Sequence, residues 1–138
     1  MVKVGEYNLL KVLRSVDFGV YLDDGKDGIL LPKRFVPPGT KDADELKVFV
    51  YHDGEDRIIA TTQQPIGILG DIVKLRTVSV TPQGAFLDWG LMKDIFVPKS
   101  KQQTTMIPQG EYLVKIYLDE QTGRIKKKKK LEPFLSNE

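Results

Sequence analysis

The hydrophobic positions of this chain fall in short runs separated by turn-forming residues. In the first half the runs are LLKVLRSV, GVYLD, GILLP, LKVFVYHD and RIIATT, which are rich in β-branched or aromatic residues. The segments between them include DDGKDG, VPPGTKDAD and DGED, whose Gly, Pro and Asp residues favour turns. Pro37 and Pro38 would break any long helix, so at most a short helical turn fits around residues 33–36. The pattern therefore predicts five strands within the first half of the chain.

The second half of the chain repeats the first. The segment GVYLD at 19–23 aligns with GAFLD at 84–88 at an offset of 65, and LPK at 31–33 aligns with VPK at 97–99 at an offset of 66. Arg57-Ile58 aligns with Arg124-Ile125 at an offset of 67. Single-residue insertions in turns explain this drift, and so many matches in the same order indicate a duplication. The second set of predicted strands is VKLRTVSV, GAFLD, DIFVP, EYLVKIYLD and GRIKK.

The repeat predicts two small domains, residues 1–66 and 67–138. The segment TTQQPIG at 61–67 joins them and is too short for a long flexible tether. Five short strands in so small a domain favour an antiparallel barrel, and the OB-fold is the common five-stranded solution. We therefore expect an all-β protein made of two tandem five-stranded OB-fold barrels.

Each copy contains an aromatic residue that strand alternation directs outward. If the apolar neighbours on either side of it face the barrel interior, Tyr21 points out of the first barrel and Phe86 out of the second. A glycine precedes each segment and suits a tightly coiled strand or a bulge. An exposed ring on such a barrel is a platform for stacking a nucleic-acid base. Phe18 would add a second ring beside Tyr21 if a bulge intervenes.

Composition and charge narrow the function further. The chain has 41% hydrophobic residues, enough for a packed core, and no cysteine, which excludes disulfides and thiolate chemistry. Residues 1–66 carry a net charge of −2 and residues 67–138 a net charge of +4, to which Lys126–Lys130 contributes five positive charges. Nucleic-acid binding must therefore use a local basic patch. With no long apolar run in the first residues, we expect no signal peptide, no membrane segment and a cytoplasmic protein.

The sequence offers little for catalysis. His52 is the single histidine, and without cysteine it cannot anchor a usual zinc site. Paired carboxylates such as Asp23 and Asp24 lie in Gly-rich turns, where Asp is expected for backbone reasons. No Ser/His/Asp arrangement, phosphate-binding loop or dinucleotide fingerprint occurs. We expect a protein that is not an enzyme and that needs no metal or cofactor.

The segments VDFGVYLD, KDGILLPKR and YHDGEDRIIAT resemble the S1-type RNA-binding domain, an OB-fold family. Phe18 and Tyr21 match the two aromatic residues of the family pattern, and Asp53 and Arg57 match its acidic and basic pair. In the second copy the matching residues are Phe86, Asp119 and Arg124. The copies depart from the pattern where an RNA-facing histidine is replaced by Leu31 and Val97, and where the first aromatic of the second copy is Gln83.

Over residues 5 to about 125 the chain is most similar to the conserved virulence factor B family, as judged from GVYLDDGKDGILLPKR, VFVYHDGEDRIIATT and PQGAFLDWGLMKDIFVP. The resemblance implies a bacterial RNA-binding protein that regulates virulence gene expression. It also implies a further S1-type domain and a C-terminal winged helix. The chain would then be the N-terminal two-domain portion, and the tail LEPFLSNE the start of the connection to the rest.

Single-stranded RNA is therefore the expected partner, bound by aromatic stacking and by Arg and Lys contacts to phosphates. The competing hypothesis is a protein-interaction module on an OB-fold that has lost RNA binding. Trp89 would either stack on a base or pack against the neighbouring domain, and Lys126–Lys130 is either a basic strip or a solvated linker. The predicted RNA-binding residues are Phe18, Tyr21, Lys33, Arg34, Asp53, Arg57, Phe86, Trp89, Lys99 and Arg124.

Overall fold

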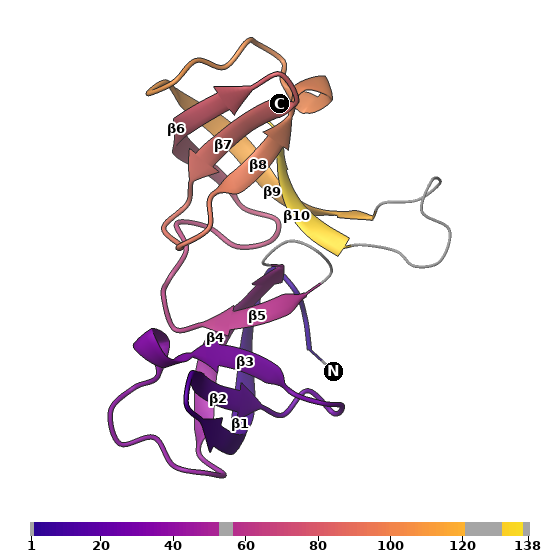
Figure 1. The fold of residues 1–138 in the computed structure, drawn as a ribbon. Coiled ribbons are helices and arrows are strands. Elements are labelled where there is room, and N and C mark those ends of the chain that lie inside the picture. The colour runs from indigo at the N-terminus through magenta and orange to yellow at the C-terminus, as the bar shows by residue number, and fades with distance from the viewer. Residues whose placement is uncertain (1, 53–56, 121–130, 137–138) are drawn as a thin grey trace. The chain divides into compact units, whose positions relative to one another are not determined.

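A computed structural model describes residues 2–52, 57–120 and 131–136, with side chains described for 2–52 and 57–117. The described residues form strands and two short 3-10 turns (Figure 1). No helix among them is long and apolar enough to cross a membrane. The elements of the first half are β1 (Tyr7–Val16), β2 (Gly19–Leu22), β3 (Ile29–Pro32), η1 (Lys33–Phe35), β4 (Glu45–His52) and β5 (Ile58–Thr61). Those of the second half are β6 (Ile72–Thr81), β7 (Gly84–Asp88), β8 (Ile95–Pro98), η2 (Lys99–Lys101), β9 (Glu111–Glu120) and β10 (Leu131–Ser136).

The chain divides into two compact units. The first comprises Met1–Gln64 and the second Pro65–Glu138. Within the described residues each unit is built almost wholly of strands, and its helical content is a single 3-10 turn after its third strand. The chain is therefore all-β, as expected from the short apolar runs.

The first unit is a closed barrel with the strand order β1-β2-β3-β5-β4. The barrel closes because β4 pairs with β1. The pairing of β3 with β5 is parallel, with Leu30 opposite Ile59, whereas the other neighbours are antiparallel. The prediction of an antiparallel barrel thus needs one correction, because strand directions cannot alternate all the way round a ring of five.

The apolar alternation of the strands fills the interior of this barrel. In β2, Val20 and Leu22 are buried while Tyr21 between them is half-buried and faces outward. This confirms the side-chain directions expected from the sequence. The core cluster consists of Val12, Val20, Leu22, Ile29, Leu31, Val48, Val50 and Ala60.

Glycine is required where β2 begins. Gly19 has a φ of +152°, and a Cβ at this position would collide with the carbonyl oxygen of Leu31 on β3. At the equivalent Gly84 a Cβ would collide with the carbonyl oxygen of Val97 and with the ring of Phe96. The backbone of the following strand therefore approaches each glycine more closely than any side chain allows.

The backbone of the second unit reproduces that of the first. Its sheet curls through the order β10-β8-β7-β6-β9, and β9 pairs with both β6 and β10. The pairing of β6 with β7 shifts register between Thr77 and Ser79, as that of β1 with β2 does between Val12 and Arg14. The duplication seen in the sequence is thus present in the strand registers.

The last strand of the second unit differs from the prediction. The predicted strand GRIKK lies at 123–127, outside the described residues, and the strand that completes the sheet is β10. The tail LEPFLSNE, expected to be a connection, supplies this strand instead. A run of lysines is a poor sequence for a barrel strand, because strand alternation would direct charged residues toward the interior.

The register of β10 also revises the alignment of the two copies. Ile59 lies opposite Tyr51 in the first unit, and Phe134 lies opposite Tyr117 in the second. Phe134 therefore takes the place of Ile59 in the strand register. Counting back two positions places Glu132, not Arg124, where the first unit has Arg57.

Candidate nucleic-acid interface

Two aromatic rings meet on the outer surface of the first barrel. Val16 pairs with Gly19 at the end of the β1–β2 hairpin, so its turn consists of Asp17 and Phe18. The tight turn brings the ring of Phe18, which is 56% exposed, to 6.2 Å from that of Tyr21, with an angle of 85° between the ring planes. This edge-to-face arrangement is a favourable one for aromatic pairs. Phe18 and Tyr21 therefore form one aromatic surface, which the turn brings together without the bulge between them that the prediction required.

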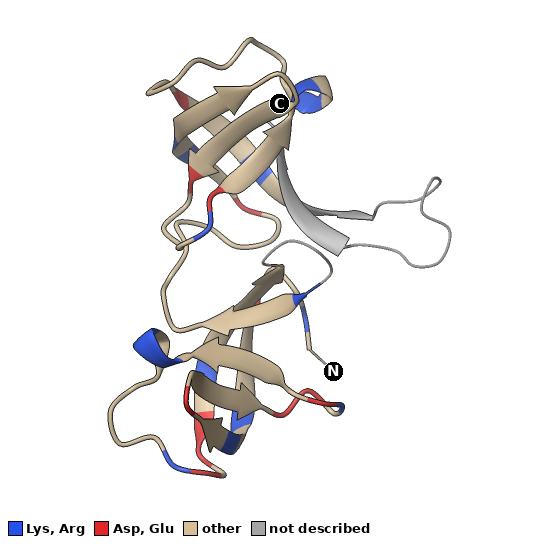
Figure 2. Cartoon of the chain, viewed as in Figure 1, with Lys and Arg blue, Asp and Glu red and all other residues tan. Residues whose placement is uncertain are grey.

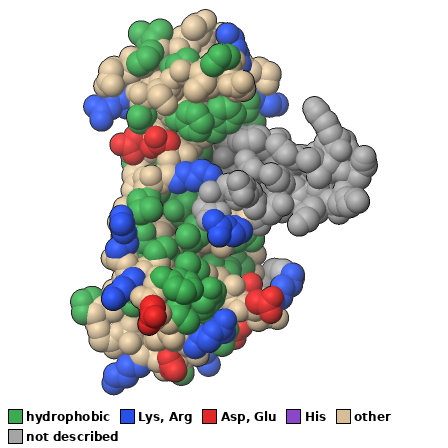
Figure 3. Space-filling view, viewed as in Figure 1, with side chains coloured by type: hydrophobic (Ala, Val, Ile, Leu, Met, Phe, Trp, Pro, Cys, Tyr) green, Lys and Arg blue, Asp and Glu red, His purple; other side chains and the backbone are tan. Residues whose placement is uncertain are grey.

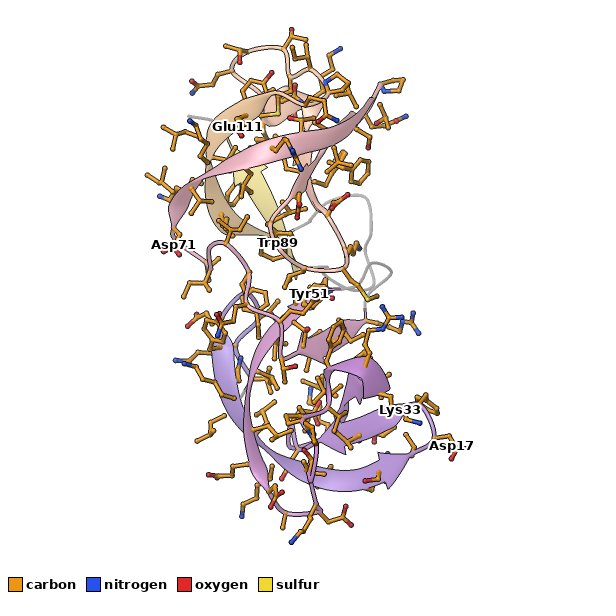
Figure 4. All side chains as sticks on the ribbon, turned by 90° about the vertical axis from the view of Figure 1, so that its left-hand side faces the viewer. Asp17, Lys33, Tyr51, Asp71, Trp89 and Glu111 are labelled. Atoms are coloured by element: carbon orange, nitrogen blue, oxygen red, sulfur yellow. The ribbon has the colours of Figure 1, made fainter. Side chains whose placement is uncertain are left out.

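The turn that carries Phe18 is held to the start of η1. The amide of Lys33 donates a hydrogen bond to the carbonyl oxygen of Phe18 over 2.9 Å. Figure 4 shows Lys33 beside Asp17, the other residue of the turn. The exposed ring of Phe18 therefore sits on a backbone that is fixed at both β2 and η1.

Arg14 lies against the Tyr21 ring and was missed by the sequence analysis. Its guanidinium carbon lies 4.5 Å from the centroid of the Tyr21 ring. The register shift after Val12 places Arg14 directly opposite Tyr21 on β2. The sequence contains a signal for this contact. A two-residue turn makes Val16 pair with Gly19, and two residues further along each strand Arg14 comes to lie opposite Tyr21.

A cavity of about 410 Å³ adjoins the Tyr21 ring, within the size range of ordinary ligand sites. Tyr21, Leu30 and Ile59 contribute to it from β2, β3 and β5, three adjacent strands of the barrel. Arg57, which precedes β5, supplies a positive charge. The complete lining is Tyr21, Asp24, Lys26, Asp27, Gly28, Ile29, Leu30, Arg57, Ile58 and Ile59.

The loop between β2 and β3 forms the polar part of this cavity. It carries acidic side chains and one lysine, Lys26 (Figure 2). One oxygen of Asp24, Oδ1, accepts hydrogen bonds from the amides of Lys26 at 2.8 Å and Gly28 at 2.9 Å. The carboxylate of Asp24 is therefore held in a fixed orientation at the cavity.

This combination of groups suits a nucleotide. An aromatic ring and apolar strand residues offer a surface for a base, and the cations of Arg14 and Arg57 offer donors for phosphate oxygens. Figure 3 shows hydrophobic side chains gathered over β2 and β3, with charged side chains around them. Within the described parts of the chain, no group of three or more acidic or histidine side chains could hold a metal ion.

The second unit presents a different surface at the corresponding strands. The ring of Phe86 lies 5.0 Å from that of Phe96 on β8, so Phe86 does have a partner ring, one that the sequence analysis missed. Phe96 pairs with Phe86 across the strands as Leu30 pairs with Tyr21. Opposite Phe86 on β6 lies Ser79, the counterpart of Arg14. This surface is apolar and has lost the cation that accompanies the ring in the first unit.

Trp89 is buried and is not placed where it could stack on a base. Only 1% of its surface is exposed, and its indole Nε1 donates a hydrogen bond to the carbonyl oxygen of Lys93 over 2.8 Å. A ring without an exposed face cannot receive a base, so the prediction of base stacking at Trp89 is wrong for this structure. Trp89 follows β7 directly, and no pattern in the sequence indicates that its side chain turns inward there.

The remaining predicted residues lie at several places. Lys33 and Arg34 are exposed in η1, outside the lining of the cavity, and Lys99 is exposed in the equivalent η2. The guanidinium of Arg34 lies 5.9 Å from the ring of Phe35. Asp53 and Arg124 lie outside the described residues, as does the run Lys126–Lys130. Of the predicted set, the structure thus brings together Phe18, Tyr21 and Arg57.

Comparison with known proteins agrees with this architecture. Residues 4–63, nearly the whole first unit, match the S1 domain family. The chain is 36% identical over 94 residues to the uncharacterized protein YitL of Bacillus subtilis (strain 168). This alignment covers 67% of this chain and 32% of YitL.

A structural likeness extends to both units. The crystal structure of a multidomain protein with nucleic acid binding domains from Streptococcus pneumoniae TIGR4 matches with a TM-score of 0.75 and 17% identity. The match covers 96% of this chain and 46% of that protein, and at this identity it concerns the fold. The chain thus spans about a third of YitL and about half of the pneumococcal protein.

Proposed function

We propose that this chain binds single-stranded RNA without catalysis, and that the first barrel carries the main site. The observation that supports this is the group formed by Phe18, Tyr21 and Arg14 beside a cavity that Arg57 also lines. In this proposal a base stacks at Tyr21, and the two arginines contact the flanking phosphates. The match of residues 4–63 to the S1 domain family adds support.

We further propose that both units are S1-type OB-fold barrels and that the second adds a weaker contact through Phe86. Its curled sheet, its strand order and its glycine at the start of β7 match those of the first unit. Lys33, Arg34 and Lys99 would contribute phosphate contacts at the edges. For the whole protein we propose a role in bacterial gene regulation, including virulence genes, in line with the family resemblance.

The test is a titration of fluorescent single-stranded RNA at two salt concentrations. The intact chain is compared with a Phe18→Ala/Tyr21→Ala variant and with a Phe86→Ala variant. We expect the double variant to bind about tenfold more weakly or worse, because base–aromatic stacking contributes about 1–3 kcal/mol per base. Phe86→Ala should have a smaller effect, because no cation accompanies its ring.

Two results would contradict the proposal. Equal binding by the intact chain and the double variant, lost at the higher salt, would reduce the interaction to unspecific charge attraction. Absence of RNA binding would favour the second candidate function, a protein-interaction module. The uncharged surface of Phe86 and Phe96, which Figure 3 shows as a hydrophobic area over β7 and β8, is the observation that favours that candidate.

A further inference from the structure

The two carboxylate oxygens of Asp24 differ in their hydrogen bonding: Oδ1 already accepts two hydrogen bonds, and Oδ2 can still accept one. Oδ1 accepts two backbone hydrogen bonds, which uses the two lone pairs of that oxygen. Among the described residues no donor is bonded to Oδ2. Asp24 is half-buried and lines the same cavity as Tyr21 and Arg57. The loop therefore presents a single oriented acceptor next to the proposed stacking surface.

We infer that Asp24 selects the base in this cavity, favouring a base that has an exocyclic amino group over uracil. The inference rests on the proposed function, because it assumes that a base stacks at Tyr21. The amino groups of cytosine and adenine donate hydrogen bonds, and carboxylates accept from cytosine N4 in nucleic-acid complexes. In uracil a carbonyl oxygen, O4, stands where cytosine has this amino group, and that oxygen would face the negative charge of Asp24.

The geometry assigns different parts of a nucleotide to different side chains. The cations of Arg14 and Arg57 suit phosphates, whereas an acceptor that is anchored by the backbone suits the edge of the base. Asp27 lines the same cavity and carries the same charge, but no hydrogen bond to its carboxylate holds it within the described structure. Asp27 therefore provides a matched control that separates a placed hydrogen bond from negative charge alone.

The decisive comparison uses cytosine and uracil oligoribonucleotides of equal length. Both bases are pyrimidines, so their stacking areas are similar and the main difference is the hydrogen-bonding edge. We expect the intact chain to bind the cytosine oligomer about tenfold more tightly, the scale of discrimination by a well-placed base contact. In Asp24→Asn the amide oxygen can still accept the two backbone hydrogen bonds, while the amide nitrogen replaces the free acceptor with a donor.

Asp24→Asn should therefore lose the preference for cytosine and shift it toward uracil, whereas Asp27→Asn should keep the preference of the intact chain. Circular dichroism and the thermal midpoint establish that the Asp24→Asn protein remains folded. Binding that depends on Tyr21 but is equal for both oligomers, or a preference unchanged in Asp24→Asn, would overturn the inference alone. A preference changed equally by Asp27→Asn would also overturn it. Absence of binding to either oligomer would overturn the proposed function and the inference together.

Discussion

The guanidinium carbon of Arg14 lies 4.5 Å from the ring centroid of Tyr21, across the first hairpin of the chain. A cation over an aromatic face at an exposed site contributes about 0.5–1 kcal/mol. The contact also fixes the direction of a side chain that has five hydrogen-bond donors. A base stacked near Tyr21 would therefore meet a positive charge that is already in place for its phosphate.

Replacing Arg14 with glutamine should weaken RNA binding and make it less dependent on salt. If Arg14 contacts one phosphate, the slope of log affinity against log salt should become less steep by about 0.7, the value per contact for single strands. The measurement is a set of binding titrations at several salt concentrations. Lys47→Gln is the control, since Lys47 lies 4.9 Å from the ring of Tyr7 and its loss changes net charge equally. Equal changes in slope for both variants would refute a specific role for Arg14.

Trp89→Phe should lower stability and leave RNA affinity unchanged. The substitution removes the hydrogen bond to the Lys93 carbonyl and shortens a buried side chain, which should cost about 1–3 kcal/mol of unfolding free energy. Urea unfolding followed by circular dichroism measures the loss. Trp89 is the one tryptophan of the chain, so its fluorescence in the intact protein should stay constant during an RNA titration. If Trp89→Phe bound RNA more weakly while its stability was unchanged, the result would show that Trp89 contacts the RNA.

Local patterns were sufficient to predict the described strands other than β10 and the outward direction of the Tyr21 ring. The outward direction of Tyr21 follows from the period of two in a strand, and the need for Gly19 follows from the close approach of β3. These features depend on residues that are near one another in the chain.

Features that depend on pairing between distant segments were predicted less well. The run of lysines interrupts the second copy. The strand β10 begins after it, at Leu131, whereas the match of Arg57-Ile58 with Arg124-Ile125 selects an earlier segment. The contact of Phe86 with Phe96 depends on the register of β7 with β8. The burial of Trp89 depends on how the segment after β7 folds back, and sequence alternation ends before that segment.

Thr77→Val should stabilise the second unit. Thr77 is fully buried, and within the described structure its Oγ1 has no hydrogen-bond partner. The equivalent residue in the first unit is Val12, which lies in the apolar core. Burying a hydroxyl without a partner costs about 1–3 kcal/mol, so the substitution should raise the unfolding free energy by about 1 kcal/mol or more. Urea unfolding of the variant tests this, with the reverse substitution Val12→Thr as a matched control that should be destabilising. A less stable Thr77→Val protein would mean that the hydroxyl has a partner in solution.

Asp94 should make the stability of the second unit depend on pH. Burial of this half-buried side chain, and secondarily the negative charge of Asp88, raise its pKa above the ordinary value of 3.8. The folded state therefore keeps the proton at a pH where the unfolded state has released it, and stability falls as pH rises from about 3.8 through the raised pKa. Asp94→Asn should not show this fall, so its stability relative to the intact chain should increase through the same window. Urea unfolding at a series of pH values measures the difference, with the exposed Asp42→Asn as control. A difference between Asp94→Asn and the intact chain that is constant with pH would show that the carboxyl titrates alike in both states.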